Sequence, residues 1–435
     1  MKPCRFVNQL NWFSHMKKLF NFILILLFPV LSFAQDVKFS TEQYKKDFDY
    51  FWTSINDEYC YFNKKQTDWN RVKQVYAPMI DTVKSRNTFV SVLEKALYEL
   101  YDHHCNFNTN TDLSRRLVPT GTDVWAEYID GKPIISEVRK NSGAEAEGIA
   151  AGMEIISVNG VPVETALQAF MPKCLQQPDI EAKSFALRLL LAGNHILPRV
   201  FSLKYEDKVR DYFPDKNGMQ LEHITYTSKV ETKMYGNTGY IRINNCLYDN
   251  ELVTAFDSAM LAMDKSKALI LDLRETPSGG NTSVARAILG WFISKEQFYQ
   301  KHEYYAEEKM FSIKRSWEEI VSPRAGKYYD KPLVILVNHW TGSIAEGITI
   351  GFDAFRRPKT KIIGTAMARL NGAVYSYEMP ETKIHFSYTA ERLYHINGLP
   401  REQYVPQIVI DMMKTKTDAG SDLFIAAALR YLKGK

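Results

Sequence analysis

The chain has 435 residues, enough for about three domains, and its composition is that of a globular protein with a sizeable core, since 45% of its residues are hydrophobic and 13% are aromatic. The formal net charge of +5 is spread along the chain and is not gathered into a basic patch. Charge therefore gives no reason to expect a nucleic-acid partner.

The amino-terminal residues have the pattern of a secretory signal. Residues 16–18 (Met-Lys-Lys) form a basic start, residues 19–31 form an apolar core, and residues 32–34 form a small-residue cleavage site. Residues 1–34 are therefore predicted to be a signal peptide, with translation beginning at Met16. The apolar run is too short for a membrane span and no cysteine follows the cleavage site, so we expect an exported protein, periplasmic or extracellular, without a stable membrane anchor.

Four cysteines remain after the predicted cleavage site, at Cys60, Cys105, Cys174 and Cys246. They are widely separated and lack the spacing of metal ligands. In a protein large enough to build its own core, free buried thiols are the more ordinary arrangement. We expect no metal and no other cofactor.

Residues 36–115 are predicted to form a helical amino-terminal domain. Apolar residues recur at helical spacing in two stretches, residues 48–55 and 89–100, and such stripes are typical of a buried helix face. The second stretch runs into Tyr-Asp-His-His-Cys at residues 101–105, where the periodicity stops.

Residues 116–204 are predicted to form a second, β-rich domain. A strand pattern at residues 131–138 is followed by a glycine-containing helical turn and then by Gly-Met-Glu-Ile-Ile-Ser-Val-Asn-Gly at residues 152–160. This segment resembles a PDZ domain, although the acid Glu154 lies one position later than the usual aspartate. PDZ domains bind extended peptide ends by adding a strand to a sheet edge, so the resemblance implies binding of substrate peptides, including their C-termini. The alternative is a structural lid on the following domain.

Residues 205–234 are polar and rich in turn signals, which indicates a linker. Over residues 235–435, strand and helix patterns alternate, and this favours crossover units with a mainly parallel sheet. The predicted fold class is α/β. Residues 296–330, rich in charge and tyrosine, interrupt the alternation and are expected to form an excursion near the cleft.

Two strand-to-helix junctions in this last region carry candidate chemistry. Residues 333–337 indicate a buried strand, and Ser343 stands where a helix begins, a place where free N–H groups and the helix dipole favour a developing negative charge. Residues 268–273 indicate a second buried strand, followed by Gly279 and Gly280, whose backbone N–H groups can face a neighbouring site. Adjacent crossovers would bring all three to one sheet edge. The alternative is that the serine only caps its helix.

The two junctions read DLRETPSGG at residues 272–280 and NHWTGSIAE at residues 338–346. They resemble the core motifs of the carboxyl-terminal processing peptidases and the related tricorn-type serine peptidases. The resemblance implies a crossover-type peptidase core of the ClpP/crotonase kind at residues 235–435, with a helical amino-terminal domain and an inserted PDZ-like domain. It also implies Ser343 as the nucleophile and an oxyanion hole made by Gly279, Gly280 and Ile344.

A serine hydroxyl needs a base to accept its proton. In the processing peptidases this base is a lysine, but the corresponding stretch here, residues 364–372, has Leu370 near that position. The neighbouring Arg369 cannot replace it, because a guanidinium stays protonated. This sequence therefore lacks the base that the lysine mechanism requires.

In the tricorn-type relatives the base is a histidine from an L-x-D-x-H segment, oriented by a glutamate near the carboxyl terminus. Leu100, Asp102 and His104 match that segment. The resemblance thus implies His104 as the base and Glu402 as the orienting carboxylate, with His103 as the alternative base. A purely structural role for His104 is the other interpretation.

The predicted function is hydrolysis of peptide bonds through an acyl-enzyme on Ser343, as in a tail-specific protease. Two other functions fit the same residues. The first is a peptide-binding protein that keeps the fold without turnover, which the missing lysine favours. The second is an esterase or amidase that acts on small acyl substrates.

Overall fold

The computed structural model describes residues 38–107, 109–216, 218, 226–414 and 422–434. The predicted signal peptide lies outside this described part of the protein. Within it, no helix has both the length and the apolar character that crossing a membrane requires. The four cysteines after the predicted signal are free thiols, of which Cys105 is half-buried and the other three are buried.

A six-stranded sheet carries the alternation predicted for residues 235–435. Its order is β17-β14-β13-β10-β9-β8, and all neighbours are parallel except β8 and β9. The central strands β10 and β13 are aliphatic throughout, except for Asp272 at the end of β10. Both are buried along their whole length, as a parallel sheet covered on both faces requires. The strands are β8 (Val230–Tyr235), β9 (Thr238–Ile243), β10 (Ala268–Asp272), β13 (Leu333–Val337), β14 (Thr360–Gly364) and β17 (Ile408–Val409).

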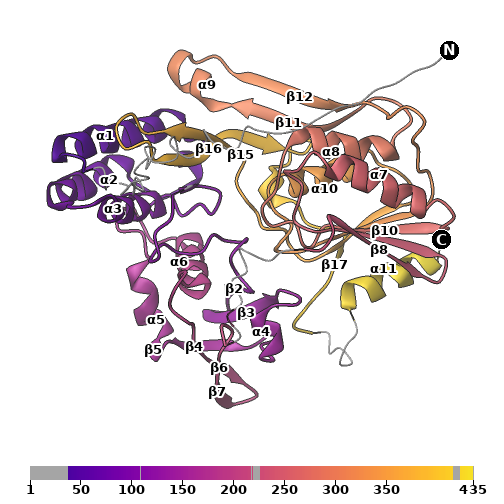
Figure 1. Ribbon diagram of the computed structural model, residues 1–435, viewed down its shortest axis with the longest axis horizontal. Helices are drawn as coiled ribbons and strands as arrows, with labels where there is room; N and C mark the ends of the chain where they lie inside the picture. The colour runs from indigo at the N-terminus through magenta and orange to yellow at the C-terminus, as the bar shows by residue number, and fades with distance from the viewer. Residues whose placement is uncertain (1–37, 108, 217, 219–225, 415–421, 435) are drawn as a thin grey trace, which may run out of the picture. The chain divides into compact units, whose positions relative to one another are not determined.

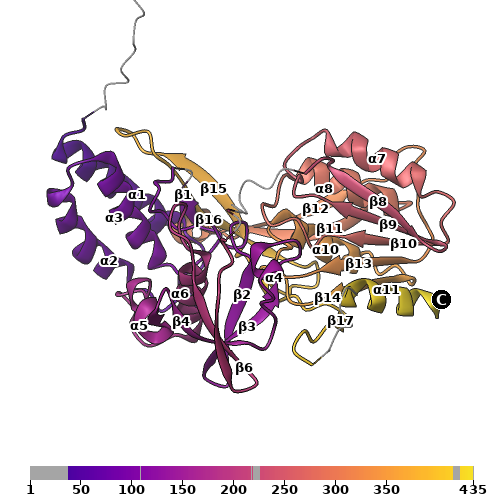
Figure 2. The same cartoon turned by 60° about the horizontal axis from the view of Figure 1, so that its bottom comes forward.

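Helices cover both faces of this sheet (Figures 1 and 2). Because side chains alternate along a strand, Leu269 and Leu271 pack in the cluster formed with α7, α8 and α10, whereas Ile270 packs with α11. The side chains of Asn281 and Asp422 accept the first backbone N–H groups of α8 and α11 and so fix where these helices begin. The helices are α7 (Leu252–Ala262), α8 (Thr282–Leu289), α10 (Ile344–Ala354) and α11 (Leu423–Lys433).

The helical spacing of the amino-terminal region is confirmed by three helices. Their apolar side chains, Phe51 and Phe89 among them, are buried in one cluster with Phe386 of β16. β16 belongs to an antiparallel sheet of order β1-β16-β11-β12, with β15 also paired to β16. The expected excursion at residues 296–330 is largely the β11-α9-β12 hairpin of this sheet. The bounds are α1 (Thr41–Glu58), α2 (Trp69–Tyr76), α3 (Arg86–Tyr98), β1 (Asn106–Phe107), β11 (Gln297–Tyr304), α9 (Tyr305–Phe311), β12 (Arg315–Val321), β15 (Ala373–Glu378) and β16 (His385–Tyr394).

A third, antiparallel sheet has the order β2-β3-β4-β6-β7, with β5 paired to β4. α6 packs beside β2, which is an edge strand. The predicted linker at residues 205–234 is shorter than expected, because it contains two edge strands. β7 is the last strand of this third sheet, and β8 is the last strand of the core sheet. Both strands are polar and exposed and have no burial pattern. The bounds are β2 (Val124–Ile129), β3 (Lys132–Val138), α4 (Gly143–Ala146), β4 (Glu154–Val158), β5 (Val161–Pro162), α5 (Val163–Ala166), α6 (Ile180–Ala192), β6 (Phe201–Tyr205) and β7 (Lys208–Tyr212).

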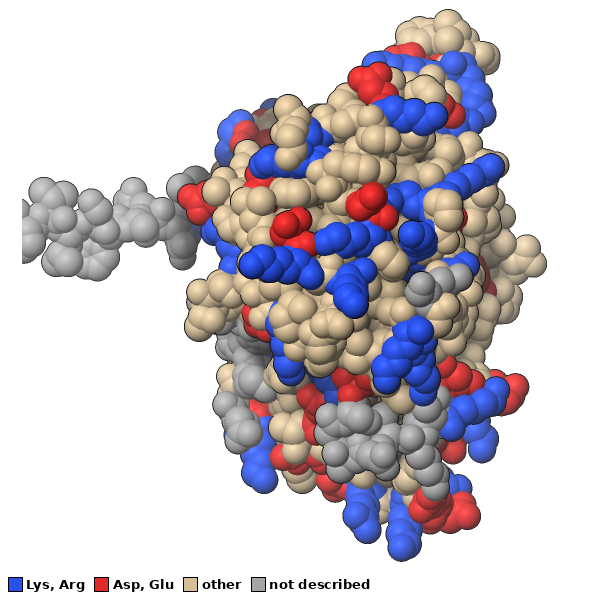
Figure 3. All heavy atoms as spheres, turned by 90° about the vertical axis from the view of Figure 1, so that its right-hand side faces the viewer, with Lys and Arg blue, Asp and Glu red and all other residues tan. Residues whose placement is uncertain are grey.

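Charged side chains of both signs are interspersed over the face drawn in Figure 3. The net charge of +5 is therefore not concentrated in one patch on that face. This agrees with the even spread of charge along the sequence.

Candidate active site

Ser343 lies at the turn between β13 and α10, at the carboxyl end of a central strand. The turn is tied to its neighbour β10 by Thr341, whose hydroxyl accepts the N–H of Asn338 at 3.0 Å and donates to the carbonyl of Leu273 at 3.0 Å. Ser343 has φ +54° and ψ −114°, a backbone conformation that residues with a side chain rarely adopt. Such conformations persist only where the surrounding structure fixes them, and they are concentrated at functional sites.

His104 faces the Ser343 hydroxyl. Its Nε2 lies 3.1 Å from Ser343 Oγ, although the two residues are 239 positions apart in the sequence. On the other side of the ring, Nδ1 lies 2.5 Å from the carbonyl oxygen of Asn371. Because a carbonyl can only accept a hydrogen bond, Nδ1 carries the proton and Nε2 presents its lone pair to the hydroxyl. This is the arrangement of a general base beside a nucleophile.

The surroundings keep His104 neutral. Burial, together with the positive charge of Arg401, lowers the pKa of His104 to about 4, and the Asn371 carbonyl and Asp102 oppose this shift only in part. The imidazole is therefore unprotonated at neutral pH and free to accept a proton. Asp102 also fixes the segment that carries the histidine, since its Oδ1 accepts the His104 N–H at 3.0 Å and its Oδ2 accepts the Tyr59 hydroxyl at 2.9 Å.

Arg401 anchors the loop that provides the Asn371 carbonyl. The side chain is buried, and its Nη2 donates to the carbonyls of Leu370 at 3.1 Å and Gly372 at 2.7 Å, the residues on either side of Asn371. Each peptide unit is planar, so fixing both neighbours leaves the carbonyl between them little freedom to turn away from the imidazole. No side-chain pattern in the sequence could have indicated this contact, because the group that contacts His104 belongs to the backbone.

Glu346 supports the nucleophile from the first turn of α10. Its Oε2 accepts the backbone N–H of Ser343 at 2.9 Å and lies 3.9 Å from Arg401 Nη2. Burial raises the pKa of Glu346 to about 7, against the opposing charge of Arg401. The sequence carried a signal for this residue, because Glu346 ends the motif NHWTGSIAE.

The glycine pair lies against the serine, because β10 and β13 are parallel neighbours as predicted. A parallel bridge between Thr276 and Thr341 continues this pairing into the two loops. Gly279 has φ +65°, and a Cβ at this position would lie 2.5 Å from Ser343 Cβ, so only glycine fits here. The Gly279 N–H donates to the Thr276 carbonyl at 3.2 Å and is therefore not directed at a substrate.

Two other backbone donors are open. Within the described ranges, no hydrogen-bond acceptor is found for the N–H of Gly280 or of Ile344. Ile344 begins α10, and the first N–H groups of a helix have no partner inside it. These two groups can hold an oxyanion, whereas Gly279 provides the space beside the serine.

The structure does not bring Glu402 to His104, contrary to the expectation for the orienting carboxylate. Glu402 Oε1 lies 2.7 Å from Lys64 Nζ, and the carbonyl of Asn371 takes the place at Nδ1. His103 is directed away from Ser343, because its Nε2 accepts a hydrogen bond from Arg188 Nε at 3.1 Å. Of the two adjacent histidines, only His104 contacts the serine.

The third sheet is bonded to the loop that precedes Ser343. The Glu137 carboxylate on β3 accepts hydrogen bonds from Asn338 Nδ2 at 2.8 Å and from the Thr365 hydroxyl at 2.7 Å, and its Oε2 lies 2.6 Å from His339 Nδ1. The His339 ring also stacks on Trp125 of β2, with 4.7 Å between ring centroids. The sheet and the nucleophile loop are thus joined by buried polar and aromatic contacts.

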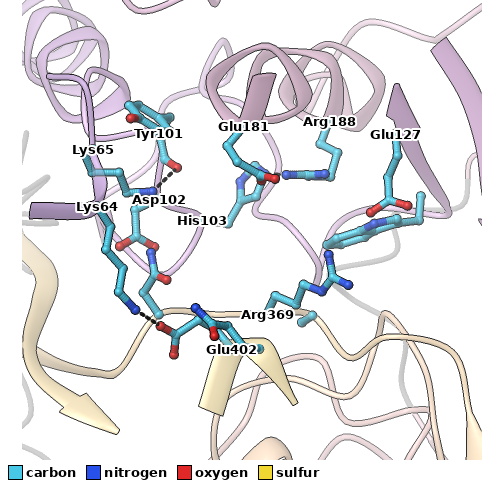
Figure 4. A pocket seen from close by; sticks show the side chains of 14 residues that line it. Lys64, Lys65, Tyr101, Asp102, His103, Glu127, Glu181, Arg188, Arg369 and Glu402 are labelled. Atoms are coloured by element: carbon cyan, nitrogen blue, oxygen red, sulfur yellow. Dashed lines mark hydrogen bonds and ion pairs between the residues drawn. The ribbon is translucent and has the colours of Figure 1, made fainter. Parts of the chain in front are cut away.

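A pocket of about 460 Å³ lies next to the segment that carries His104 (Figure 4). Its lining includes Asp102 and His103, next to His104 in the sequence, and Asn371, which holds the imidazole. Other lining residues come from β2 and α6, and from the loops that carry Arg369 and Glu402. Most of the residues that line the pocket are charged or polar, and two aromatic side chains, Tyr101 and Trp125, lie among them.

Two family models match the protein: tricorn protease C1 domain over residues 40–97 and peptidase family S41 over residues 237–410. Among solved structures, mature CPAF is 15% identical with a TM-score of 0.58, over 85% of this chain and 92% of that chain. The photosystem II D1 C-terminal processing protease is 16% identical with a TM-score of 0.54, over 86% of this chain and 95% of that chain. At these identities the structures show a shared mixed α/β fold with several sheets. The comparison with curated proteins finds no match.

Proposed function

The protein is a serine-type peptidase that carries a peptidase family S41 domain, and from this premise we propose that it hydrolyses peptide bonds through an acyl-enzyme on Ser343. The observation that carries the proposal is the 3.1 Å separation of Ser343 Oγ and His104 Nε2, with Nδ1 held by the Asn371 carbonyl. This geometry gives the hydroxyl a neutral base with a defined tautomer.

In the first step, Ser343 Oγ bonds to the scissile carbonyl carbon while His104 Nε2 takes the hydroxyl proton. The N–H groups of Gly280 and Ile344 hold the oxyanion, and each such donor contributes about 3–4 kcal/mol to transition-state stabilisation. The imidazolium then gives its proton to the leaving amine as the C–N bond breaks. Water attacks the resulting ester with the same histidine as base, which releases the acid and restores the serine.

We propose that the third sheet is a PDZ-like domain that binds substrate peptides, including their C-termini. Supporting this, β2 is an edge strand with α6 beside it. Trp125 and Glu127 on β2 and Arg188 on α6 line the same pocket as Asp102 and His103, which precede His104, and Asn371, whose carbonyl contacts its ring. A peptide that adds as a strand to β2 would therefore lead into the site of cleavage.

We also propose that the protein is exported and acts in the periplasm or outside the cell, after removal of residues 1–34. The support is the basic start, apolar core and small-residue cleavage site of the sequence. Amino-terminal sequencing of the protein recovered from the periplasm or medium tests this, and Gln35 is the expected first residue.

The experiment that tests the catalytic proposal combines a fluorophosphonate probe with a quenched peptide library. We expect the folded wild type to react with the probe and cleave peptides, and Ser343→Ala and His104→Ala to do neither. Labelling without cleavage of any peptide would favour an esterase or amidase. A folded wild type that neither labels nor cleaves, yet binds peptides, would favour a peptide-binding protein without turnover.

A further inference from the structure

Two charged side chains of the third sheet contact the two loops that carry the catalytic groups. Glu137 lies near the end of β3, and Arg139 directly follows this strand, where its N–H donates to the Asp123 carbonyl at 2.9 Å. Side chains two positions apart on an extended strand lie on the same face. Glu137 and Arg139 are both buried, each with 2% of its surface exposed, so water does not compete for their hydrogen bonds.

Glu137 holds the nucleophile loop, which comprises residues 338–342 between β13 and Ser343. Its carboxylate accepts three hydrogen bonds, from the side chains of Asn338 and His339 in this loop and from Thr365 after the neighbouring strand β14. With its Nδ2 held by Glu137, the Asn338 amide presents its Oδ1 to the N–H of Trp340 at 2.9 Å. Glu137 therefore fixes the orientation of the amide that shapes this turn.

Arg139 holds the oxyanion loop, which comprises residues 275–280. Its Nε donates to the two carboxylate oxygens of Glu275 at 3.0 and 3.3 Å, and its Nη2 also donates to Oε1. Its Nη1 donates to the Thr120 carbonyl at 2.8 Å, which fixes the guanidinium from the segment before β2. A planar guanidinium with several bonds to one carboxylate determines the orientation of that carboxylate as well as its position.

The two loops are also bonded to each other. The N–H of Thr276 donates to the Trp340 carbonyl at 3.2 Å, and the carbonyl of Thr276 accepts the N–H of Gly342 at 3.3 Å. Gly342 directly precedes the nucleophile, and Gly280, at the end of the oxyanion loop, provides one of the two open N–H groups. The relative position of nucleophile and oxyanion donors therefore depends on how both loops are held.

We propose that Glu137 and Arg139 are positioning residues of the reaction, Glu137 for the nucleophile loop and Arg139, through Glu275, for the oxyanion loop. The proposal rests on the proposed peptidase function and deepens it. Among the described residues, neither side chain bonds to Ser343 or His104, so each acts through the loop that it holds. A displacement of about 1 Å at a catalytic group can lower the rate about 10²-fold, whereas the oxyanion contacts contribute little to binding of the uncleaved peptide.

Steady-state kinetics on the full-length protein tests this proposal with one peptide from the cleavage library. We expect kcat to fall at least about tenfold in Glu137→Gln and in Arg139→Met. The Kd of the same peptide, measured by fluorescence anisotropy after adding Ser343→Ala to each variant, should change by less than about threefold. The affinity for the corresponding peptide aldehyde, to which the serine adds reversibly, should fall with kcat, because this adduct needs both loops in place.

A double-mutant cycle tests whether Arg139 acts through Glu275. Glu275→Gln keeps the size of the side chain, and we expect it to lower kcat about as much as Arg139→Met. The double variant should lose no more than either single variant, since both changes break one contact. Because Glu275→Gln leaves no unpaired charge on residue 275, it also keeps the test available if Arg139→Met does not fold.

Arg199 provides the matched control. It is an arginine of the same sheet, also 2% exposed, and its ion pairs reach Asp123 and Asp215 and neither catalytic loop. Arg199→Met should lower the melting temperature at least as much as Arg139→Met, because two buried acids lose their partner. Its kcat should nevertheless stay within about twofold of the wild type.

A folded Glu137→Gln or Glu275→Gln protein with wild-type kcat would overturn the proposal. A loss of kcat in Arg199→Met as large as that in Arg139→Met would also overturn it, and so would additive losses in the double variant. Fluorophosphonate labelling separates this proposal from the peptidase itself. If the wild type and all variants label at one rate, the peptidase stands and the positioning role is removed, whereas an unlabelled wild type removes the peptidase.

Discussion

The nucleophile half and the base half of the site are built in different ways. Ser343 and the glycine pair follow two adjacent parallel strands, so short local segments position them. The base half is assembled from three segments that are distant in the sequence, which supply His104, the carbonyl of Asn371 and the guanidinium of Arg401. The comparison shows that a short sequence motif can determine the position of the nucleophile, whereas the position of its base depends on contacts between distant segments.

The largest expected effect separates the two adjacent histidines. His104→Ala should lower kcat/KM about 10⁴-fold, because the hydroxyl then lacks a base. His103→Gln keeps an acceptor for Arg188 and should lower kcat/KM by less than about tenfold. Steady-state kinetics with one peptide checks both variants, and similar losses in the two would contradict the assignment of the base.

Arg401→Met tests whether the base half depends on the anchored carbonyl. Without the two hydrogen bonds to the carbonyls on either side of Asn371, the imidazole loses its fixed orientation, and we expect kcat/KM to fall about 10²-fold. Loss of the positive charge should also move the acid limb of the pH profile upward, since that charge lowers the pKa of His104. A merely unstable variant would lower the melting temperature and leave the acid limb in place.

The third prediction concerns how the labelling rate of the wild type depends on pH. The expected change is smaller, and the pKa of His104 fixes its direction. Because the pKa of His104 is lowered to about 4, the labelling rate should stay level from pH 7 to pH 5 and fall as the pH decreases through about 4. The folded state then binds fewer protons than the unfolded state, whose histidine titrates near 6.5, so this residue lowers the free energy of unfolding as the pH falls from about 6.5 to 4. A labelling midpoint near 6.5 would show an exposed base.

The smallest expected effect concerns Glu402. Its carboxylate pairs with Lys64, whose side chain is 38% exposed, and such a pair contributes about 0–1 kcal/mol. Glu402→Gln should therefore change kcat/KM by less than about threefold, and Lys64→Met serves as the control for the pair. A loss of 10²-fold or more would restore the carboxylate as the group that orients the base.

Much of the core could be predicted because its signals are local. The buried strands at residues 268–273 and 333–337 and the helices after them follow from short apolar runs and their breaks, and the parallel pairing of the strands then places Gly279 beside Ser343. The edge strands β7 and β8 were missed, because exposed polar strands have no burial pattern. The contact between Asn371 and His104 could not be predicted, because any residue at position 371 offers the same carbonyl.

The backbone conformation of Ser343 links catalysis to the stability of the fold. At φ +54° and ψ −114° the Cβ is strained against the main chain, and a residue held in such a conformation costs about 1–3 kcal/mol. Glycine adopts this conformation without the strain, so Ser343→Gly should unfold at a higher temperature than Ser343→Ala, although neither variant can be acylated. The strain at Ser343 is therefore a cost in stability that the protein bears to hold its nucleophile in place, and at this position the requirements of activity and of stability oppose each other.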